Sequence, residues 1–169
     1  RTFVTGDYDV VRFSKDGFFK LNTAPFRVPD LTVFAVVEQT QAERRSYFST
    51  YSNAVNWGYG VNLDMEGSGT RAFTSAGTQD TISDWWTAGP GPGMHMITTA
   101  ISSTLGSKSI FVDGALLGGP VAVPGISYYS AETASVGALG QLDIDYFFFR
   151  GDIAELIVYN TVDTTLRST

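Results

Sequence analysis

Apolar and polar positions alternate in short runs along the whole chain. The runs are rich in valine, isoleucine, phenylalanine, tyrosine and threonine, and glycine or proline separates them at intervals of about 8–12 residues, a spacing typical of an all-β sandwich or barrel. No segment shows helical periodicity over three turns, and one helical turn is expected after Asp163 at the C-terminus. The predicted strands lie near residues 8–13, 17–21, 31–38, 46–51, 57–64, 70–75, 94–101, 108–112, 115–118, 133–138 and 147–159.

Three short turns predict hairpins between these strands. In "IFVDGALL", Asp113 and Gly114 stand between two apolar runs, and an Asp-Gly pair accepts the positive φ that both central positions of a type I′ turn require. The glycines of "GSG" at 67–69 tolerate a second reversal of the chain. Asp16 and Gly17 predict a third hairpin.

Length, composition and charge restrict the class of protein. The 169 residues fit one domain over 1–169, and 43% apolar residues suffice for one core. A net charge of −6 with scattered basic residues argues against binding to nucleic acid. The chain has no cysteine and His95 is its one histidine, which excludes disulfides and thiolate or multi-histidine zinc sites. The longest apolar run, at 31–37, is too short for a membrane span.

Four segments carry a family resemblance. "FFRGDIAELIVYN" at 148–160, followed by "TVDTTLRS", resembles the closing strand of LamG-like jelly rolls in the concanavalin A-like lectin/glucanase superfamily. "VVRFSKDGFFKLN", "LTVFAVVE" and "MHMITTAISSTLGSKSIFVDGALLGG" occur in the order expected for that family. The resemblance implies a two-sheet antiparallel jelly-roll sandwich with little or no helix.

The same resemblance implies a setting for the domain. Such domains are glycan-binding or adhesive parts of larger proteins, so we expect a location outside the cell, on the cell surface or on a virion surface. The sequence has no initiator methionine and no signal peptide, and we therefore expect it to be a piece of a longer precursor with other modules or subunits. Because one scaffold hosts many activities, function has to be argued from individual residues.

Glu155 stands in the middle of the apolar closing strand. Strict alternation would place it on the same face as Ile153, Ile157 and Tyr159. A buried carboxylate needs partners, so we expect Glu155 to be tied to backbone amides or a hydroxyl group as a structural residue.

Paired carboxylates are the signature of glycoside hydrolysis, which needs two of them across the scissile bond. The chain has such pairs two residues apart at Asp7/Asp9, Asp64/Glu66 and Asp143/Asp145, but none extends into a Glu-x-Asp-x-Glu run. We expect the first two pairs to be solvated. Asp143 and Asp145 precede the closing strand, where their oxygens could bind Ca²⁺, the one cofactor considered.

Other catalytic arrangements have little support. A lone strand histidine such as His95 is more often a packed or surface residue than a catalytic base. No Gly-x-Ser-x-Gly nucleophile elbow occurs. We therefore predict that the protein is not an enzyme, and a polysaccharide hydrolase or lyase is the least favoured interpretation.

Aromatic residues make up 14% of the chain and offer a different chemistry. A sugar ring presents flat C–H faces and a rim of hydroxyl groups, so its site needs an aromatic plate with polar side chains beside it. Adjacent Trp85 and Trp86 should point in opposite directions, so that at most one is exposed, and Trp57 could equally belong to the core. The carbohydrate-binding candidates are Tyr51, Asn53, Asn56, Trp57, Trp85, Trp86, Tyr128 and Tyr129.

The sequence as a whole predicts a non-catalytic carbohydrate-binding module that recognises glycan through the loops at the rim of a sandwich. The alternative is an adhesive or structural module of a surface protein or phage particle, whose partner is a protein or a neighbouring subunit. A concave groove with an aromatic residue would favour glycan, whereas a flat apolar patch larger than about 400 Å² would favour protein.

Overall fold

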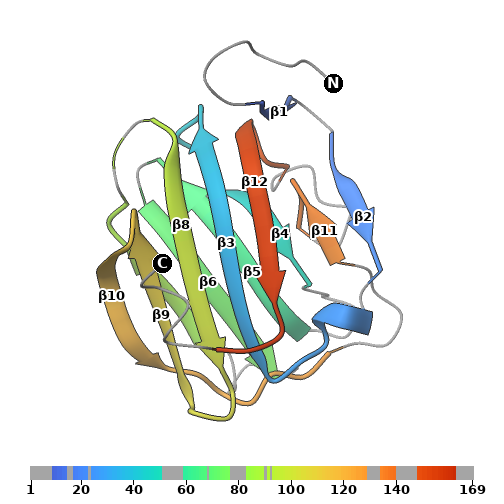
Figure 1. The fold of residues 1–169 in the computed structure, drawn as a ribbon, viewed down its shortest axis with the longest axis vertical. Coiled ribbons are helices and arrows are strands. Elements are labelled where there is room, and N and C mark those ends of the chain that lie inside the picture. The colour runs from blue at the N-terminus through green and yellow to red at the C-terminus, as the bar shows by residue number, and fades with distance from the viewer. Residues whose placement is uncertain are drawn as a thin grey trace.

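The protein is a sandwich of two antiparallel sheets (Figure 1). The computed structural model describes residues 9–14, 17–22, 24–50, 59–67, 69–76, 83–89, 91, 93–128, 134–139 and 148–162. The strands are Val11–Phe13 (β1), Phe19–Leu21 (β2), Asp30–Gln39 (β3), Arg45–Ser49 (β4), Tyr59–Glu66 (β5), Gly69–Ala76 (β6), Ser83–Thr87 (β7), His95–Ser102 (β8), Ser107–Val112 (β9), Ala115–Ala122 (β10), Ala134–Val136 (β11) and Gly151–Tyr159 (β12). A 3₁₀ turn at Ala24–Phe26 is the one helical element of these ranges.

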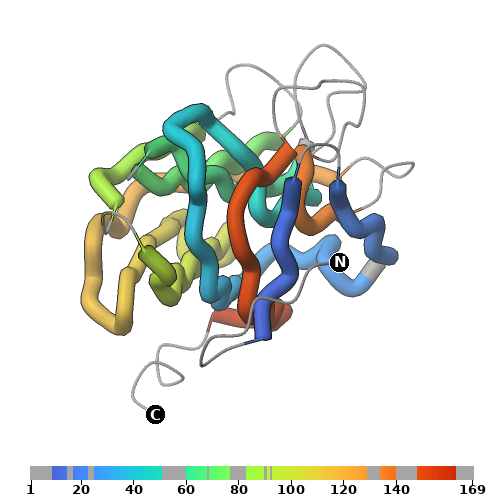
Figure 2. The backbone as a smooth tube through the Cα atoms, turned by 90° about the horizontal axis from the view of Figure 1, so that it is seen from above, coloured from blue at the N-terminus to red at the C-terminus, as the bar shows by residue number. Residues whose placement is uncertain are grey.

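Each sheet has six strands among the described residues. The first sheet has the order β1-β12-β3-β8-β9-β10, and the second has the order β2-β11-β4-β5-β6-β7. Figure 2 shows them as two layers. The non-sequential order confirms the predicted jelly-roll sandwich. No helix of the described ranges is long and apolar enough to cross a membrane.

Two of the three predicted hairpins are confirmed. Asp113 and Gly114 have φ values of 48° and 80°, as the type I′ turn between β9 and β10 requires. Strands β5 and β6 pair directly across the turn at Gly67. The prediction of a hairpin at Asp16–Gly17 was wrong. Strand β1 pairs with β12 in the first sheet, whereas β2 pairs with β11 in the second. This segment therefore carries the chain from one sheet to the other.

The core lies between the sheets and is built largely from alternate residues of the central strands. Fully burying one such aliphatic side chain stabilises the fold by roughly 1.5–3 kcal/mol. The central strands β3 and β5 supply a large share of these residues, which are at most 3% exposed: Leu31, Val33, Ala35, Val37, Val61, Leu63 and Met65.

Glu155 is exposed, so the predicted buried anchor was wrong. A β-bulge explains the difference, because the pairing of β12 with β3 shifts by one residue between Ile153 and Glu155. Ile153 therefore points into the core, and beyond the bulge it is Leu156 and Val158 that pack against the core. The sequence pattern gave no sign of the extra residue.

A lysine is buried between the two sheets. Lys108 on β9 is 1% exposed, and its Nζ donates hydrogen bonds to the backbone oxygens of Ala72 and Ser83 at 2.6 and 2.7 Å. Those acceptors lie on β6 and β7, so this side chain links the first sheet to the edge of the second. Burial lowers the pKa of Lys108 to about 8.

The shifted pKa of Lys108 predicts a pH dependence of stability. Above pH 8 the folded protein releases a proton that the unfolded chain keeps up to about pH 10.5, so the free energy of unfolding should rise between pH 8 and 9.5. Urea denaturation at several pH values measures the slope. Lys108→Met should abolish the rise, and the exposed Lys20→Met should retain it. A rise of equal size in Lys108→Met would show that another group causes it.

Candidate functional site

Most of the predicted sugar-binding and metal-binding residues lie outside the described ranges. Their roles stay predictions. These residues are Tyr51, Asn53, Asn56, Trp57, Tyr129, Asp143 and Asp145. Among the described residues, no group of three or more His, Cys, Asp or Glu side chains could hold a metal ion.

Trp85 and Trp86 belong to a strand that is not among those predicted from the sequence. They lie in β7, which pairs with β6 at the edge of the second sheet. Trp85 points inward and packs against the core, with its ring so close to Gly118 that a Cβ there would lie 2.6 Å from it. Trp86 points outward and is 37% exposed. The expectation that at most one of the two is exposed is therefore consistent with the structure.

Tyr128 is a structural anchor in this structure. Its hydroxyl group donates a hydrogen bond of 2.8 Å to the backbone oxygen of Val28, and burial raises the pKa of Tyr128 to about 12. The ring is half-buried and its hydroxyl group is already hydrogen-bonded, so Tyr128 is poorly suited to stacking on a sugar. The predicted binding role of Tyr128 therefore gains no support.

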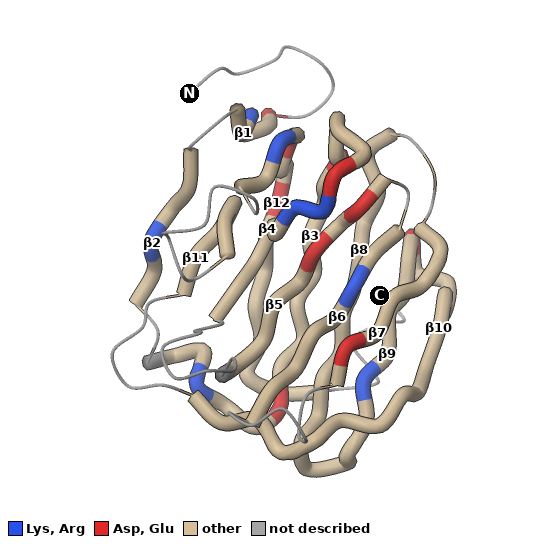
Figure 3. The backbone as a smooth tube through the Cα atoms, turned by 180° about the vertical axis from the view of Figure 1, so that it is seen from behind, with Lys and Arg blue, Asp and Glu red and all other residues tan. Residues whose placement is uncertain are grey.

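A cluster of charged side chains surrounds Trp86 on the outer face of the second sheet. We call Arg44, Asp64, Arg71, Asp84 and Trp86 the charged platform. Figure 3 views this sheet from its outer side and shows acidic and basic positions alternating across β4–β7. Alternation places these side chains outward, because their neighbours Leu63, Ala72 and Trp85 point into the core.

The Asp64 carboxylate is the centre of the platform. It is 0% exposed and accepts hydrogen bonds from Arg44 Nε at 2.6 Å and from Arg71. Arg71 also donates from Nη1 to Asp84 at 2.9 Å, so one guanidinium group joins carboxylates of β5 and β7. The prediction that Asp64 would be solvated is wrong.

Neutral side chains extend this network toward β4. Asn62 donates to Asp64, and the Ser46 hydroxyl group bonds the amide oxygen of Asn62 at 2.5 Å. The bonded row thus runs from β4 through β5 and β6 to β7. Buried polar groups require such hydrogen-bond partners, and a network in which they are satisfied holds its side chains in place. The row therefore makes this part of the outer face rigid.

Burial controls the protonation of the two carboxylates. Complete burial raises the pKa of Asp64 to about 6, although the charge of Arg44 opposes the shift. Partial burial also raises the pKa of Asp84, and Arg44 again opposes it. Asp64 is therefore ionised at pH 7. Below about pH 6 it becomes protonated, and its ion pair with Arg71 loses the negative charge.

The two arginines also hold the indole of Trp86. The guanidinium carbons of Arg71 and Arg44 lie 5.1 and 5.7 Å from the ring centroid, within the range of cation–π contacts. The exposed part of the indole therefore has a fixed orientation, with the half-exposed Asp84 on the same strand. An aromatic surface beside an accessible carboxylate and guanidinium is suited to a ring with hydroxyl groups.

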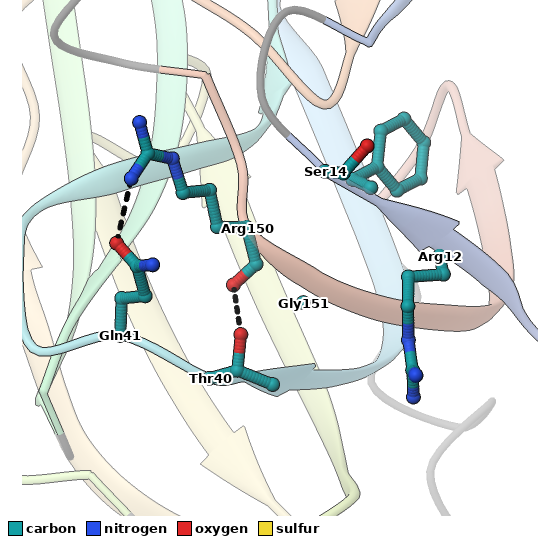
Figure 4. Close-up of a pocket in the computed structure, with 7 residues that line it drawn as sticks. Arg12, Ser14, Thr40, Gln41, Arg150 and Gly151 are labelled. Carbon is teal, nitrogen blue, oxygen red and sulfur yellow. Dashed lines mark hydrogen bonds between the residues drawn. The ribbon is translucent and has the colours of Figure 1, made fainter.

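One end of the sandwich carries a separate pocket of about 330 Å³ (Figure 4). On one side Arg150 donates a 2.9 Å hydrogen bond to Gln41, and Thr40 donates to the backbone oxygen of Arg150 at 3.1 Å. On the other side Arg12 forms a two-bond ion pair with Asp152, at 2.7 and 2.8 Å. The described lining residues include no carboxylate, so they supply no acid and base for hydrolysis.

His95 forms a pair with the hairpin aspartate. Its Nδ1 lies 2.7 Å from Asp113 Oδ2, and Asp113 Oδ1 accepts the amide of Met96 at 3.0 Å. The hydrogen bond with His95 lowers the pKa of Asp113. These contacts secure the β9–β10 turn to the start of β8, which agrees with the expected structural role of His95.

Comparisons with known proteins show the fold. No protein-family profile and no curated protein sequence matches the chain. Among solved structures, it resembles the CBM40 domain of a Ruminococcus gnavus sialidase bound to α2,3-sialyllactose, with a TM-score of 0.75 and 10% identity over 93% of this chain and 92% of the other. It also resembles a heptameric pentraxin from Limulus polyphemus, with a TM-score of 0.67 and 16% identity over 98% and 83% of the two chains.

A third resemblance is to a part of a larger enzyme. The NanB sialidase of Streptococcus pneumoniae matches with a TM-score of 0.70 and 12% identity, over 95% of this chain and 27% of that one. These likenesses confirm the expected two-sheet jelly-roll fold.

The buried ion pairs of Asp64 predict a large effect on stability. Asp64→Ala leaves Arg71 buried without its main partner, and we expect the free energy of unfolding to fall by about 3–5 kcal/mol. Glu66→Ala is the matched control, because Glu66 is exposed on the same face of the same strand and should change stability by no more than about 0.5 kcal/mol. Chemical denaturation of both variants tests this, and equal losses would contradict it.

Proposed function

We propose that the protein is a non-catalytic glycan-binding module that binds sugar on the charged platform. The observation that carries this proposal is the exposed indole of Trp86, held by Arg71 and Arg44 beside the accessible carboxylate of Asp84. The sugar would stack its C–H face on the indole. Its hydroxyl groups would then donate to Asp84 and accept from Arg44.

The proposed site differs from the site predicted by the sequence. Trp86 reaches solvent from a strand face, so recognition through this residue takes place on the sheet. The rim-loop candidates Tyr51, Asn53, Asn56, Trp57 and Tyr129 could extend the site and keep the role predicted for them. The presence of a CBM40 domain bound to sialyllactose among similar structures supports a glycan-binding use of this fold.

The absence of catalysis is part of the proposal. Both carboxylates of the platform are engaged with Arg71, and Asp64 is inaccessible to a substrate. A hydrolase needs one carboxyl group as acid and a second as base or nucleophile at the same bond. The arrangement therefore favours binding over bond cleavage.

The setting of the module follows from its proposed use. We infer that it lies outside the cell, on a cell surface or on a virion, as one part of a larger protein with other modules or subunits. A single site with one stacked aromatic ring should bind modestly. Repetition of the module would raise the overall affinity through effective concentration.

One observation favours the alternative function of adhesion to a protein. A row of side chains crosses the outer face of the first sheet through directly paired positions: Ile157, Phe34, Thr98, Phe111 and Leu116. Ile157 and Leu116, at the two ends of the row, are 37% and 56% exposed, and Tyr159 on the same face is 40% exposed, whereas Thr98 and Phe111 between them are 3% and 8% exposed. Exposed apolar surface of this kind is common where proteins meet.

Trp86→Ala should weaken glycan binding by about tenfold or more, since a central aromatic contact commonly contributes more than 1 kcal/mol. The test is a glycan array on the isolated domain, followed by calorimetric titration of the strongest glycan. Tyr159→Ala is the matched control, because Tyr159 has a similar exposure of 40% on the opposite face of the sandwich.

The two faces give distinguishable outcomes. Loss of binding in Trp86→Ala with full binding in Tyr159→Ala supports the platform. Full binding in Trp86→Ala would remove the platform as the site, and the absence of binding to any glycan would leave the adhesive function as the better explanation. Repeating the array with EDTA tests the predicted contribution of calcium at Asp143 and Asp145.

A further inference from the structure

The charges on and around the platform limit which sugars it can accept. Its two guanidinium groups, Arg44 and Arg71, face the carboxylates of Asp64 and Asp84. Glu66 adds a third carboxylate, because it is exposed on the same face of β5, two residues beyond Asp64. Lys108 adds a third positive charge, because its buried Nζ bonds the backbone oxygen of Ser83 next to Asp84, so the three cations and three carboxylates balance at pH 7 while the whole chain carries a net charge of −6.

The accessibility of these groups gives the exposed surface an acidic bias, because two of the three cations, Arg71 and Lys108, are buried. Arg71 is 2% exposed and already bonded to both aspartates, so a ligand in solution cannot reach it. The Arg44 side chain is 34% exposed, and its Nε is bonded to Asp64. The Asp84 side chain is 41% exposed. The charged groups that a sugar on Trp86 would meet are therefore the partly exposed guanidinium of Arg44, bonded to Asp64, and the partly exposed carboxylate of Asp84, bonded to Arg71. The exposed Glu66 adds a second carboxylate to this surface.

An acidic sugar would gain little at this surface. Of the platform cations it could reach Arg44 alone, whose charge is already matched by the bonded Asp64, and it would lie on the same face as Asp84 and Glu66, which carry the same charge as the ligand. Like charges at short range are unfavourable even in water. A ring that carries hydroxyl groups alone has no such conflict, because it can donate to Asp84 and cover the indole.

We propose, building on the glycan-binding function above, that the platform binds uncharged sugars and discriminates against acidic ones. The role of the arginines is then to orient Trp86 and Asp84, while their charge is neutralised within the protein. Affinity should therefore depend little on salt, since no counter-charge is exchanged with the ligand.

The test compares matched pairs of neutral and acidic sugars. Lactose is paired with α2,3- and α2,6-sialyllactose, and galacto-oligosaccharides are paired with oligogalacturonides, each titrated at 50 and 500 mM NaCl. We expect the neutral member of each pair to bind more tightly than the acidic member at 50 mM NaCl. Its Kd should change by less than about twofold between the two salt concentrations.

A variant that removes one exposed carboxylate provides a second test. Asp84→Asn removes the exposed carboxylate, so the ratio of acidic to neutral affinity should rise about threefold at 50 mM NaCl, and the rise should shrink at 500 mM. Glu155→Gln removes an exposed carboxylate from the first sheet and makes the same change in net charge. It should leave the ratio unchanged.

The outcomes separate this inference from the function on which it rests. Binding of the acidic member as tightly as or more tightly than the neutral member would overturn the inference and leave glycan binding intact. Equal ratios in Asp84→Asn and Glu155→Gln would also overturn it, because Asp84 would then have no local effect. Failure to bind any member of the panel, neutral or acidic, would contradict the proposed function itself.

Discussion

The burial of the Asp64 carboxylate between two guanidinium groups determines the shape of the outer face. A fully buried carboxylate is strongly disfavoured unless charges and hydrogen bonds compensate it, and here Arg44, Arg71 and Asn62 all donate to it. Arg71 is thereby fixed in position, and its second bond extends to Asp84. Trp86 then packs against two immobilised cations, so its exposed part faces solvent in a defined orientation.

This polar network depends on the apolar core beneath it. Each strand of the second sheet that contributes to the platform also sends alternate residues inward, as Trp85 does beside Trp86. The core sets the positions of β5, β6 and β7, and the network then joins them on the other side. Lys108 adds a third connection, because it crosses from the first sheet to the backbone of β6 and β7. The edge that carries Trp86 is therefore tied to both layers.

Much of the fold could be predicted from the sequence because strand signals are local. Apolar runs and glycine spacing located eleven of the strands. The turn at Asp113-Gly114 could be predicted from these two residues alone. β7 was missed, because "SDWW" is short and flanked by residues typical of loops. The bulge at Ala154 reverses the alternation of β12 without any local sign, which explains the error over Glu155.

The platform was harder to predict than the strands. The alternation of "VNLDMEG" shows that Asp64 points away from the core, but it does not show that arginines from residues 44 and 71 cover it. That arrangement arises from strand order, which brings β4–β7 side by side. Trp86 was identified as a candidate because it is an aromatic residue outside the predicted strands with polar neighbours in the sequence, and its surroundings became visible with the pairing of β6 and β7.

The most direct test of the site is to map the contact surface by two-dimensional nuclear magnetic resonance of the labelled protein. The three tryptophans give three indole N–H signals. Adding a neutral oligosaccharide that binds should shift the indole signal of Trp86 and the amide signals of Arg71 and Asp84, and leave those of the first sheet in place. Shifts confined to the first sheet, or to residues 51–58, with an unchanged Trp86 signal would contradict a binding site on the charged platform.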